Sequence, residues 1–259
     1  MFKILQNRMT QGHRTTKFPL EVPELPERYR GRPEIDPSKC PDGCKACEEA
    51  CPTQAITAEG GLKLDLGRCL FCTACIDACP EGAVRYTRDH RMATSRREDL
   101  VLSGQELKLA EGMADEIHKI LGRALRLREV CAGSCVACDL DTNVLNTVGW
   151  DLSRFGIQFV ASPRHADGLV VAGAISQNMN PTLRQTYEAL PAPRIVIAVG
   201  ACAISGGPFR GSPEVNDGIN DLLPVDLCIP GCPPHPLTIL DGLLRLIRRI
   251  PLAIHGGSR

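Results

Sequence analysis

The cysteine content of this chain is its strongest constraint. The chain has 14 cysteines among 259 residues, and eight of them lie between Cys40 and Cys79. These eight form two runs of four, Cys40-x3-Cys44-x2-Cys47-x3-Cys51-Pro52 and Cys69-x2-Cys72-x2-Cys75-x3-Cys79-Pro80. The first residues lack the apolar core of a secretory signal, roughly 7–15 residues long. So many thiols therefore indicate metal binding rather than a disulfide framework, and we expect a small, metal-dense domain at residues 40–103.

The second run has the cysteine spacing of bacterial ferredoxins. In that pattern three close thiolates bind three irons of a 4Fe–4S cubane, and the fourth, directed by the following proline, binds the neighbouring cluster. The runs thus predict an α+β, ferredoxin-like domain with two 4Fe–4S clusters. One cluster is assigned to Cys40, Cys44, Cys47 and Cys79, and the other to Cys69, Cys72, Cys75 and Cys51.

Two points about the octet stay open. A pair of zinc sites is the alternative, although such sites usually join two C-x2-C-like hooks across a longer loop and do not explain two runs that each end in Cys-Pro. The first run also has one residue more than the second, because Pro41-Asp42-Gly43 separates its first two cysteines. Glycine can absorb a bulge there, so the role of Cys40 and the potential of the first cluster are left undecided.

Residues 131–259 have the pattern of a second, α/β domain. Short apolar runs bounded by turn residues at 156–160, 168–171, 194–199 and 225–229 indicate buried parallel strands. Helices are expected from Asn180 through Leu190 and from Pro236 onward, since proline is tolerated in a first helical turn. Strands that alternate with helices predict an open parallel sheet, as in flavodoxin-like domains.

A second set of cysteines follows these strands. Cys202 comes directly after the run 194–199, Cys232 after the run 225–229, and Cys135 and Cys138 after a short apolar stretch. Loops at the carboxyl ends of parallel strands share one edge of the sheet, so these four thiols can meet. With glycines beside them they suit a third 4Fe–4S cluster, and a four-cysteine zinc site remains the alternative.

The other segments are expected to do less. Residues 1–39, with a proline-rich run over 18–33, predict an extended arm, and a short amphipathic membrane-surface helix over residues 2–9 is an alternative for its start. The three- and four-residue apolar steps within 104–128 predict a helix that connects the two domains over residues 104–130. Cys131 and Cys228 are interpreted as buried free thiols. His165 and His235 are interpreted as ordinary polar residues, and Trp150 as a core residue.

Composition and motifs exclude several functions. The chain has 30 basic and 30 acidic residues, which gives no support to nucleic-acid binding. It has no apolar run near the roughly 18 residues of a membrane span. It also lacks a GxGxxG motif, a phosphate-binding loop and a nucleophile constellation. What it carries is one-electron chemistry through iron–sulfur clusters.

The cysteine motifs resemble those of a known family. Gly133–Cys138 with Asp139-Leu140-Asp141, Gly200-Ala201-Cys202 with Ser205-Gly206-Gly207, and Pro230–Pro234 resemble the small subunit of energy-converting (group 4) nickel–iron hydrogenases. That protein is related to the B subunit of complex I, the 20 kDa subunit family. Complex I proteins of this family usually have adjacent cysteines where this chain has Cys135-x2-Cys138, so the spacing favours the hydrogenase branch. The family often has Glu at the position of Asp141. The N-terminal part, with the octet, resembles the ferredoxin subunit of formate hydrogenlyase.

The resemblance implies a fusion of two subunits and an electron-transfer role. The third cluster would be the proximal one, facing a nickel–iron site in a separate large subunit, so this chain would hold no catalytic residue of its own. Implied partners are that large subunit, integral membrane subunits, and an electron-donating subunit or soluble ferredoxin. The expected location is peripheral, on the cytoplasmic side of the cell membrane. Two alternatives are a complex I-like subunit that reduces quinone or sulfane, and a non-catalytic ferredoxin with a zinc-holding docking domain.

Overall fold

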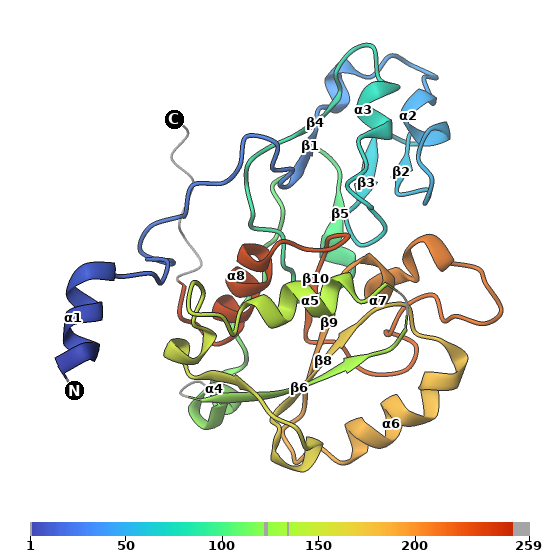
Figure 1. Ribbon diagram of the computed structural model, residues 1–259. Coiled ribbons are helices and arrows are strands. Elements are labelled where there is room, and N and C mark those ends of the chain that lie inside the picture. Colours follow the sequence, from blue (N-terminus) through green and yellow to red (C-terminus); the bar gives the residue numbers. More distant parts are fainter. Residues whose placement is uncertain (1, 122–123, 134, 251–259) are drawn as a thin grey trace.

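The computed structural model describes residues 2–121, 124–133 and 135–250, which form an N-terminal helix, a small cysteine-rich unit and a larger α/β unit (Figure 1). None of the helices in this described part of the chain is long and apolar enough to cross a bilayer. The helix α1 (Phe2–Gln11) has no buried residue and stands apart from the two units.

The helix α1 corrects the expectation of an arm extended along its whole length and agrees with the alternative of a short helix at its start. Phe2–Gln11 contains neither proline nor glycine, so nothing in it opposes helix formation. Residues 12–32, which include the prolines, form neither helix nor strand, as expected. They lie along the α/β unit, where Arg154 donates hydrogen bonds to the carbonyl oxygens of Thr16 and Phe18 at 2.7 and 2.8 Å.

The cysteine-rich unit consists of two small antiparallel sheets and two four-residue helices. β1 (Pro33–Ile35) pairs with β4 (Val84–Tyr86), and the second sheet has the order β2 (Ile56–Thr57), β3 (Lys63–Asp65), β5 (Val101–Leu102). The helices α2 (Ala46–Glu49) and α3 (Ala74–Asp77) each carry the third cysteine of a run, Cys47 and Cys75, and bury it. The two runs therefore fold into similar local structures.

The α/β unit contains the predicted open parallel sheet. Its strands are β6 (Leu125–Cys131), β7 (Ile157–Phe159), β8 (Gly168–Ala172), β9 (Ile195–Val199) and β10 (Leu227–Ile229), in the spatial order β10-β9-β8-β6-β7. Every pairing among them is parallel. All five residues of β8 and of β9 are buried, which is why these strands are continuous apolar runs in the sequence.

Helices cover both faces of this sheet. Leu169 and Val171 of β8 pack in one core with Leu183 of α6 (Asn180–Glu188), whereas Val170 packs in another core with Leu240 of α8 (Pro236–Leu246). The helix α5 (Ala137–Val144) contacts α8 on that second side, and α7 (Ala201–Ser205) follows β9 at the sheet edge. The helices expected at Asn180 and Pro236 are thus confirmed.

The connecting helix expected over 104–130 is wrong for most of its length. Of its described residues, 104–121 and 124–130, only α4 (Asp115–Leu121) is helical, and Leu125–Cys131 is strand β6 of the sheet. Before α4, Ala110 donates its backbone N–H to Ala93 at 2.7 Å, and Met113 donates to Leu246 at 2.9 Å. These tertiary hydrogen bonds replace helical ones. Residues 107, 110 and 113 are buried by this extended packing, which reproduces a helix-like spacing of apolar residues.

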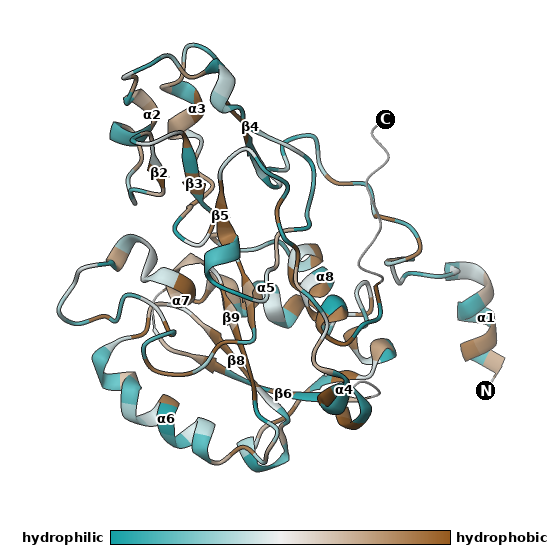
Figure 2. Cartoon of the chain, turned by 180° about the vertical axis from the view of Figure 1, so that it is seen from behind, coloured by the Kyte–Doolittle hydropathy of each residue, from teal (hydrophilic) through white to brown (hydrophobic). Residues whose placement is uncertain are grey.

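The cysteine-rich unit packs directly on the end of the α/β unit. The backbones of Thr94 and Cys228 exchange two hydrogen bonds, at 2.8 and 3.0 Å. The buried Ser205 hydroxyl of α7 donates to the carbonyl oxygen of Gly67 at 2.7 Å. A Cβ on Gly67 would lie 2.8 Å from Ile204, so this contact is close packed. The edge of the sheet that follows β9 and β10 therefore faces the octet. Figure 2 shows, from behind, that β8 and β9 are apolar strands in the interior.

Candidate metal centres

The structure brings the first group of octet thiols together around α2. Burial raises the pKa of Cys47, and the nearby sulfurs of Cys79, Cys40 and Cys44 raise it further. The pKa of Cys40 is also raised, by burial first and then by Cys44 and Cys79. These four thiols therefore lie near enough for their charges to interact. Cys40 belongs to this group in spite of the longer spacing that follows it.

The second group lies around α3 and includes a cysteine from the first run. Burial raises the pKa of Cys69 to about 12, with Cys75 and Cys51 as further causes. Burial also raises the pKa of Cys75 to about 11, followed by the effects of Cys51 and Cys72. The fourth cysteine of each run thus sits with the first three of the other run, which is the exchange that the ferredoxin spacing predicts.

Backbone and hydroxyl donors point at several of these sulfurs. The N–H of Ala55 lies 3.2 Å from Cys51 Sγ, and the N–H of Ala83 lies 3.3 Å from Cys79 Sγ. Each donor comes four residues after its cysteine, in equivalent places of the two runs. On the second group, the Tyr86 hydroxyl lies 3.8 Å from Cys69 Sγ. Hydrogen bonds of this kind favour thiolates over thiols, so they suit sulfurs that bind metal.

The third group forms where three loops leave the carboxyl end of the sheet. Cys138 lies in the first turn of α5, Cys202 lies in α7 after β9, and Cys232 follows β10. Burial raises the pKa of Cys138, and Cys202, Cys232 and Cys135 raise it further. Burial likewise raises the pKa of Cys202 to about 11, with Cys232 and Cys135 as the other causes. Cys138 and Cys202 are buried, whereas Cys135 and Cys232 are exposed, so this group is open on one side.

Two glycines make room for the third group. A Cβ on Gly200 would lie 2.5 Å from Cys138 Sγ, and a Cβ on Gly207 would lie 2.8 Å from Cys202 Sγ. Both glycines have positive φ, +88° and +55°, which side-chain-bearing residues rarely adopt. The backbone can therefore approach the sulfurs closely, and the all-thiol donor set with this cradle fits a 4Fe–4S cluster. Among the residues with described positions, no three His, Cys, Asp or Glu side chains converge on a point where they could share one metal ion. A 4Fe–4S cluster does not need such convergence, because each of its four cysteines binds a different iron.

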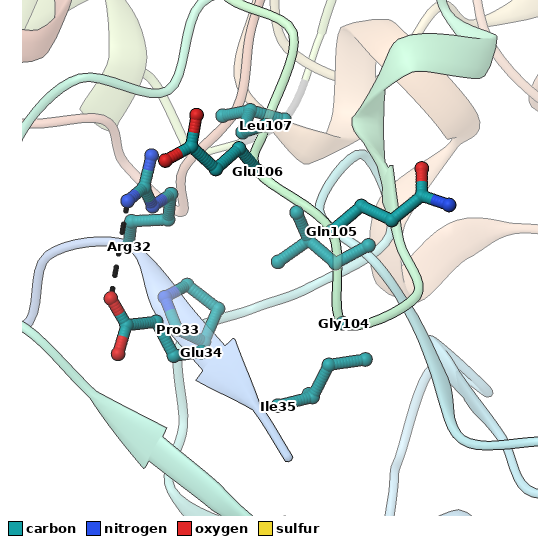
Figure 3. A pocket seen from close by; sticks show the side chains of 9 residues that line it. Arg32, Pro33, Glu34, Ile35, Gly104, Gln105, Glu106 and Leu107 are labelled. Atoms are coloured by element: carbon teal, nitrogen blue, oxygen red, sulfur yellow. Dashed lines mark ion pairs between the residues drawn. The ribbon is translucent and has the colours of Figure 1, made fainter. Parts of the chain in front are cut away.

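The second and third groups face one another. Cys72 is among the causes that raise the pKa of Cys232, although 160 residues separate them in the sequence. A cavity of about 480 Å³ lies at this junction and is lined by both cysteines, by Phe71 and Asp141, and by His235. A smaller cavity of about 290 Å³ between β1 and the chain after β5 is lined by Arg32, Glu34 and Leu107 among others and contains no cysteine (Figure 3).

The other cysteines, the two histidines and the tryptophan named in the sequence analysis differ in their burial. Cys228 is buried, as expected, but Cys131 is exposed, because β6 alternates and its last residue points outward. Neither has another cysteine among its charged neighbours. His165 is exposed. His235 caps α8 by accepting the N–H of Leu237 at 3.1 Å. Trp150 is only half-buried.

Two acids beside the third group were not anticipated. Glu129 Oε1 and both carboxylate oxygens of Asp139 are buried and find no hydrogen-bond partner within the described residues, whereas Glu129 Oε2 accepts from Asn143 Nδ2 at 3.1 Å. Burial raises the pKa of Glu129 to about 7, and Asp139 raises it further. The sequence predicts a helix over residues 104–130, which include Glu129, and it gives no signal that Glu129 meets Asp139.

Comparison with known proteins agrees with this division of the chain. Residues 135–246 match the family model of the NADH ubiquinone oxidoreductase 20 kDa subunit, and residues 39–83 match that of a 4Fe–4S dicluster domain. A probable membrane-bound hydrogenase subunit of Pyrococcus furiosus is 37% identical over 60% of this chain and 92% of its own length. An NADH-quinone oxidoreductase subunit of Phocaeicola vulgatus is 45% identical over 47% of this chain and 61% of its own length. Among solved structures, a chain of the archaeal membrane-bound sulfane sulfur reductase covers 52% of this chain and 75% of its own, with 28% identity and a TM-score of 0.46.

Proposed function

Because the chain belongs to the 20 kDa subunit family of NADH ubiquinone oxidoreductase and carries a 4Fe–4S dicluster domain ahead of it, we propose that it is the electron-transfer subunit of a membrane-associated nickel–iron hydrogenase complex. It passes electrons through three 4Fe–4S clusters to or from the nickel–iron site of a partner large subunit, which reduces protons or oxidises hydrogen. The observation that carries the proposal is the succession of three four-thiol groups, the second and third of which meet at Cys72 and Cys232.

The ligands of the three clusters follow from the thiol groups. The first cluster is held by Cys40, Cys44, Cys47 and Cys79, the second by Cys69, Cys72, Cys75 and Cys51, and the third by Cys135, Cys138, Cys202 and Cys232. The clusters supply one-electron carriers whose potentials depend on hydrogen bonds, charge and exposure. The residues of this chain bury the sulfurs, supply N–H donors and fix the order of the sites.

The proximity of Cys72 and Cys232, which line one cavity, sets the order of the sites along the path within the chain. With clusters bound, electrons would pass between the first and second sites within the octet, and between the second and third sites across the junction beside Phe71. The third site then opens toward the partner. Next to the exposed Cys135, Val136 and Leu140 are 49% and 64% exposed, and exposed apolar side chains beside a redox site suit a subunit interface. This face is where the large subunit docks.

The proposal also defines the other partners and the location. An electron-donating subunit or a soluble ferredoxin meets the octet, and integral membrane subunits hold the complex. The chain is then peripheral, on the cytoplasmic side of the cell membrane, where thiols stay reduced and available for clusters.

The native complex provides the test. We expect it to contain nickel, to contribute about twelve irons from this chain, and to turn over hydrogen with a viologen dye. Reduction of quinone or sulfane without nickel would overturn the hydrogenase proposal and favour a complex I-like role, which the 45% identity to an NADH-quinone oxidoreductase subunit supports. About eight irons plus zinc in the chain would instead indicate a ferredoxin with a zinc-holding docking domain.

The Tyr86 hydroxyl gives a prediction about the second cluster. Its hydrogen bond to Cys69 Sγ stabilises negative charge, so Tyr86→Phe should lower the reduction potential. A hydrogen bond of about 1 kcal/mol corresponds to roughly 40 mV for one electron, at 59 mV per tenfold change. Redox titration followed by EPR measures the shift. Tyr187→Phe, in α6, is the matched control and should leave all three potentials unchanged.

A further inference from the structure

A cavity of about 290 Å³ lies between the N-terminal segment, the chain at residues 88–91 and the end of α8. Its lining contains no cysteine. One wall is formed by Phe18, Pro19 and Val22, and the opposite wall by Asp241, Arg245 and Ile250. The volume is near the lower end, roughly 300 Å³, of pockets that bind small molecules.

The lining of this cavity includes polar groups with unused hydrogen-bonding capacity. Arg245 is only 2% exposed and donates from Nε and Nη2 to the carboxylate of Asp241, at 2.8 and 3.3 Å. Its Nη1 is buried and has no hydrogen-bond partner within the described residues, and the same is true of His90 Nε2. His90 is 6% exposed, and its Nε2 lies 3.9 Å from Asp241 Oδ1. A buried donor without a partner is costly, and more so when it is charged.

The walls combine apolar surface with an excess of positive charge. The Phe18 ring meets the His90 ring edge-on at 5.7 Å, and Pro19, Val22 and Ile250 extend this apolar surface. The charged lining consists of Arg88, Arg91, Asp89, Asp241 and Arg245. Burial lowers the pKa of His90, so this ring is neutral. Three cations then face two carboxylates. Arg91 is engaged with Asp89 at 2.8 Å, and Arg88 donates from Nη2 to the carbonyl oxygen of Leu25. Arg245 lines the cavity and has, in Nη1, a buried donor without a partner within the described residues.

We propose that this cavity binds a small amphiphilic anion, a carboxylate on a short apolar chain. The carboxylate accepts hydrogen bonds from Arg245 Nη1 and from His90 Nε2–H, and the apolar chain lies against Phe18, Pro19 and Val22. Such a ligand would join the N-terminal segment to α8, since each contributes one wall. This site is separate from the thiol groups, so the inference does not depend on the hydrogenase proposal.

Binding of octanoate to the full-length chain with its clusters tests the inference. Isothermal titration calorimetry should give one octanoate bound per chain. Octanol and octylamine should bind at least tenfold more weakly, because they have the same apolar chain without the negative charge. Val22→Trp, which fills the cavity from its rim, should weaken octanoate at least tenfold. Val148→Trp, at a residue that is 71% exposed and outside the cavity, should not change it.

A second variant keeps the inference testable if the tryptophan side chain in Val22→Trp points away from the cavity. Arg245→Lys keeps a cation beside Asp241 but removes the Nη1 donor, and it should weaken octanoate at least tenfold while circular dichroism confirms that the chain is folded. The inference is overturned if octanoate does not bind, if octanol binds as well, or if folded Arg245→Lys binds octanoate like the unsubstituted chain.

Discussion

Replacing Cys135 with alanine is expected to lower the iron content of the chain from about twelve to about eight atoms, because a 4Fe–4S cluster needs its set of four cysteines. The sulfur of Cys135 lies near those of Cys138, Cys202 and Cys232, whose pKa values it helps to raise. Without it the third cluster has three protein ligands and an open side, since Cys232 is also exposed. Hydrogen turnover by the complex should fall to background, because the path to the partner is broken.

Cys131 provides a matched control for this substitution. It lies four residues before Cys135, is also exposed, and has Asp139 and Glu129 rather than other cysteines as its charged neighbours. Cys131→Ala should therefore keep about twelve irons and all three EPR signals of the reduced chain. Elemental analysis and EPR on both variants give the answer. Loss of the third signal in Cys131→Ala, with its retention in Cys135→Ala, would show that Cys131, four residues earlier, is the ligand in place of Cys135.

Much of this arrangement could be predicted from the sequence because its causes are local. The spacing of each cysteine run, with its closing Cys-Pro, already predicts that Cys51 and Cys79 change places between the two groups. The continuous apolar runs of β8 and β9 predict buried parallel strands. From there the position of Cys202 and Cys232 after β9 and β10 follows from the geometry of a parallel sheet.

The predictions from the sequence fail where contacts between residues far apart in the sequence determine the structure. Leu125 and Leu127 are buried and alternate with arginines, a period of two that indicates a strand. The stronger three- and four-residue pattern before them concealed it. The meeting of Glu129 with Asp139, the hydroxyl of Tyr86 on Cys69, and the fit of Gly200 against Cys138 each join segments that no local rule connects. The exposure of Cys131 is a consequence of the same missed strand, because its outward direction follows from the alternation in β6.

Gly200→Ala should produce the second large effect, the loss of the third cluster through the backbone rather than through a ligand. Gly200 has φ +88° and ψ 158°, a region that is essentially restricted to glycine, so alanine costs about 1–3 kcal/mol in backbone strain. The new Cβ would also lie 2.5 Å from Cys138 Sγ. Cys138 is buried and has little room to move, so its sulfur should be displaced from the other three.

Gly211→Ala separates the steric effect from the strain. Gly211 also has a positive φ, +78°, but a Cβ there would meet no atom within 4 Å. It should cost roughly 1–2 kcal/mol and keep about twelve irons, whereas Gly200→Ala should retain about eight irons and lose more stability. Iron analysis with thermal unfolding of both variants distinguishes the two effects. Equal melting temperatures and a full iron content in both would mean that the close approach of Gly200 to Cys138 has no part in forming the third site, and that its thiols alone determine whether a cluster is held.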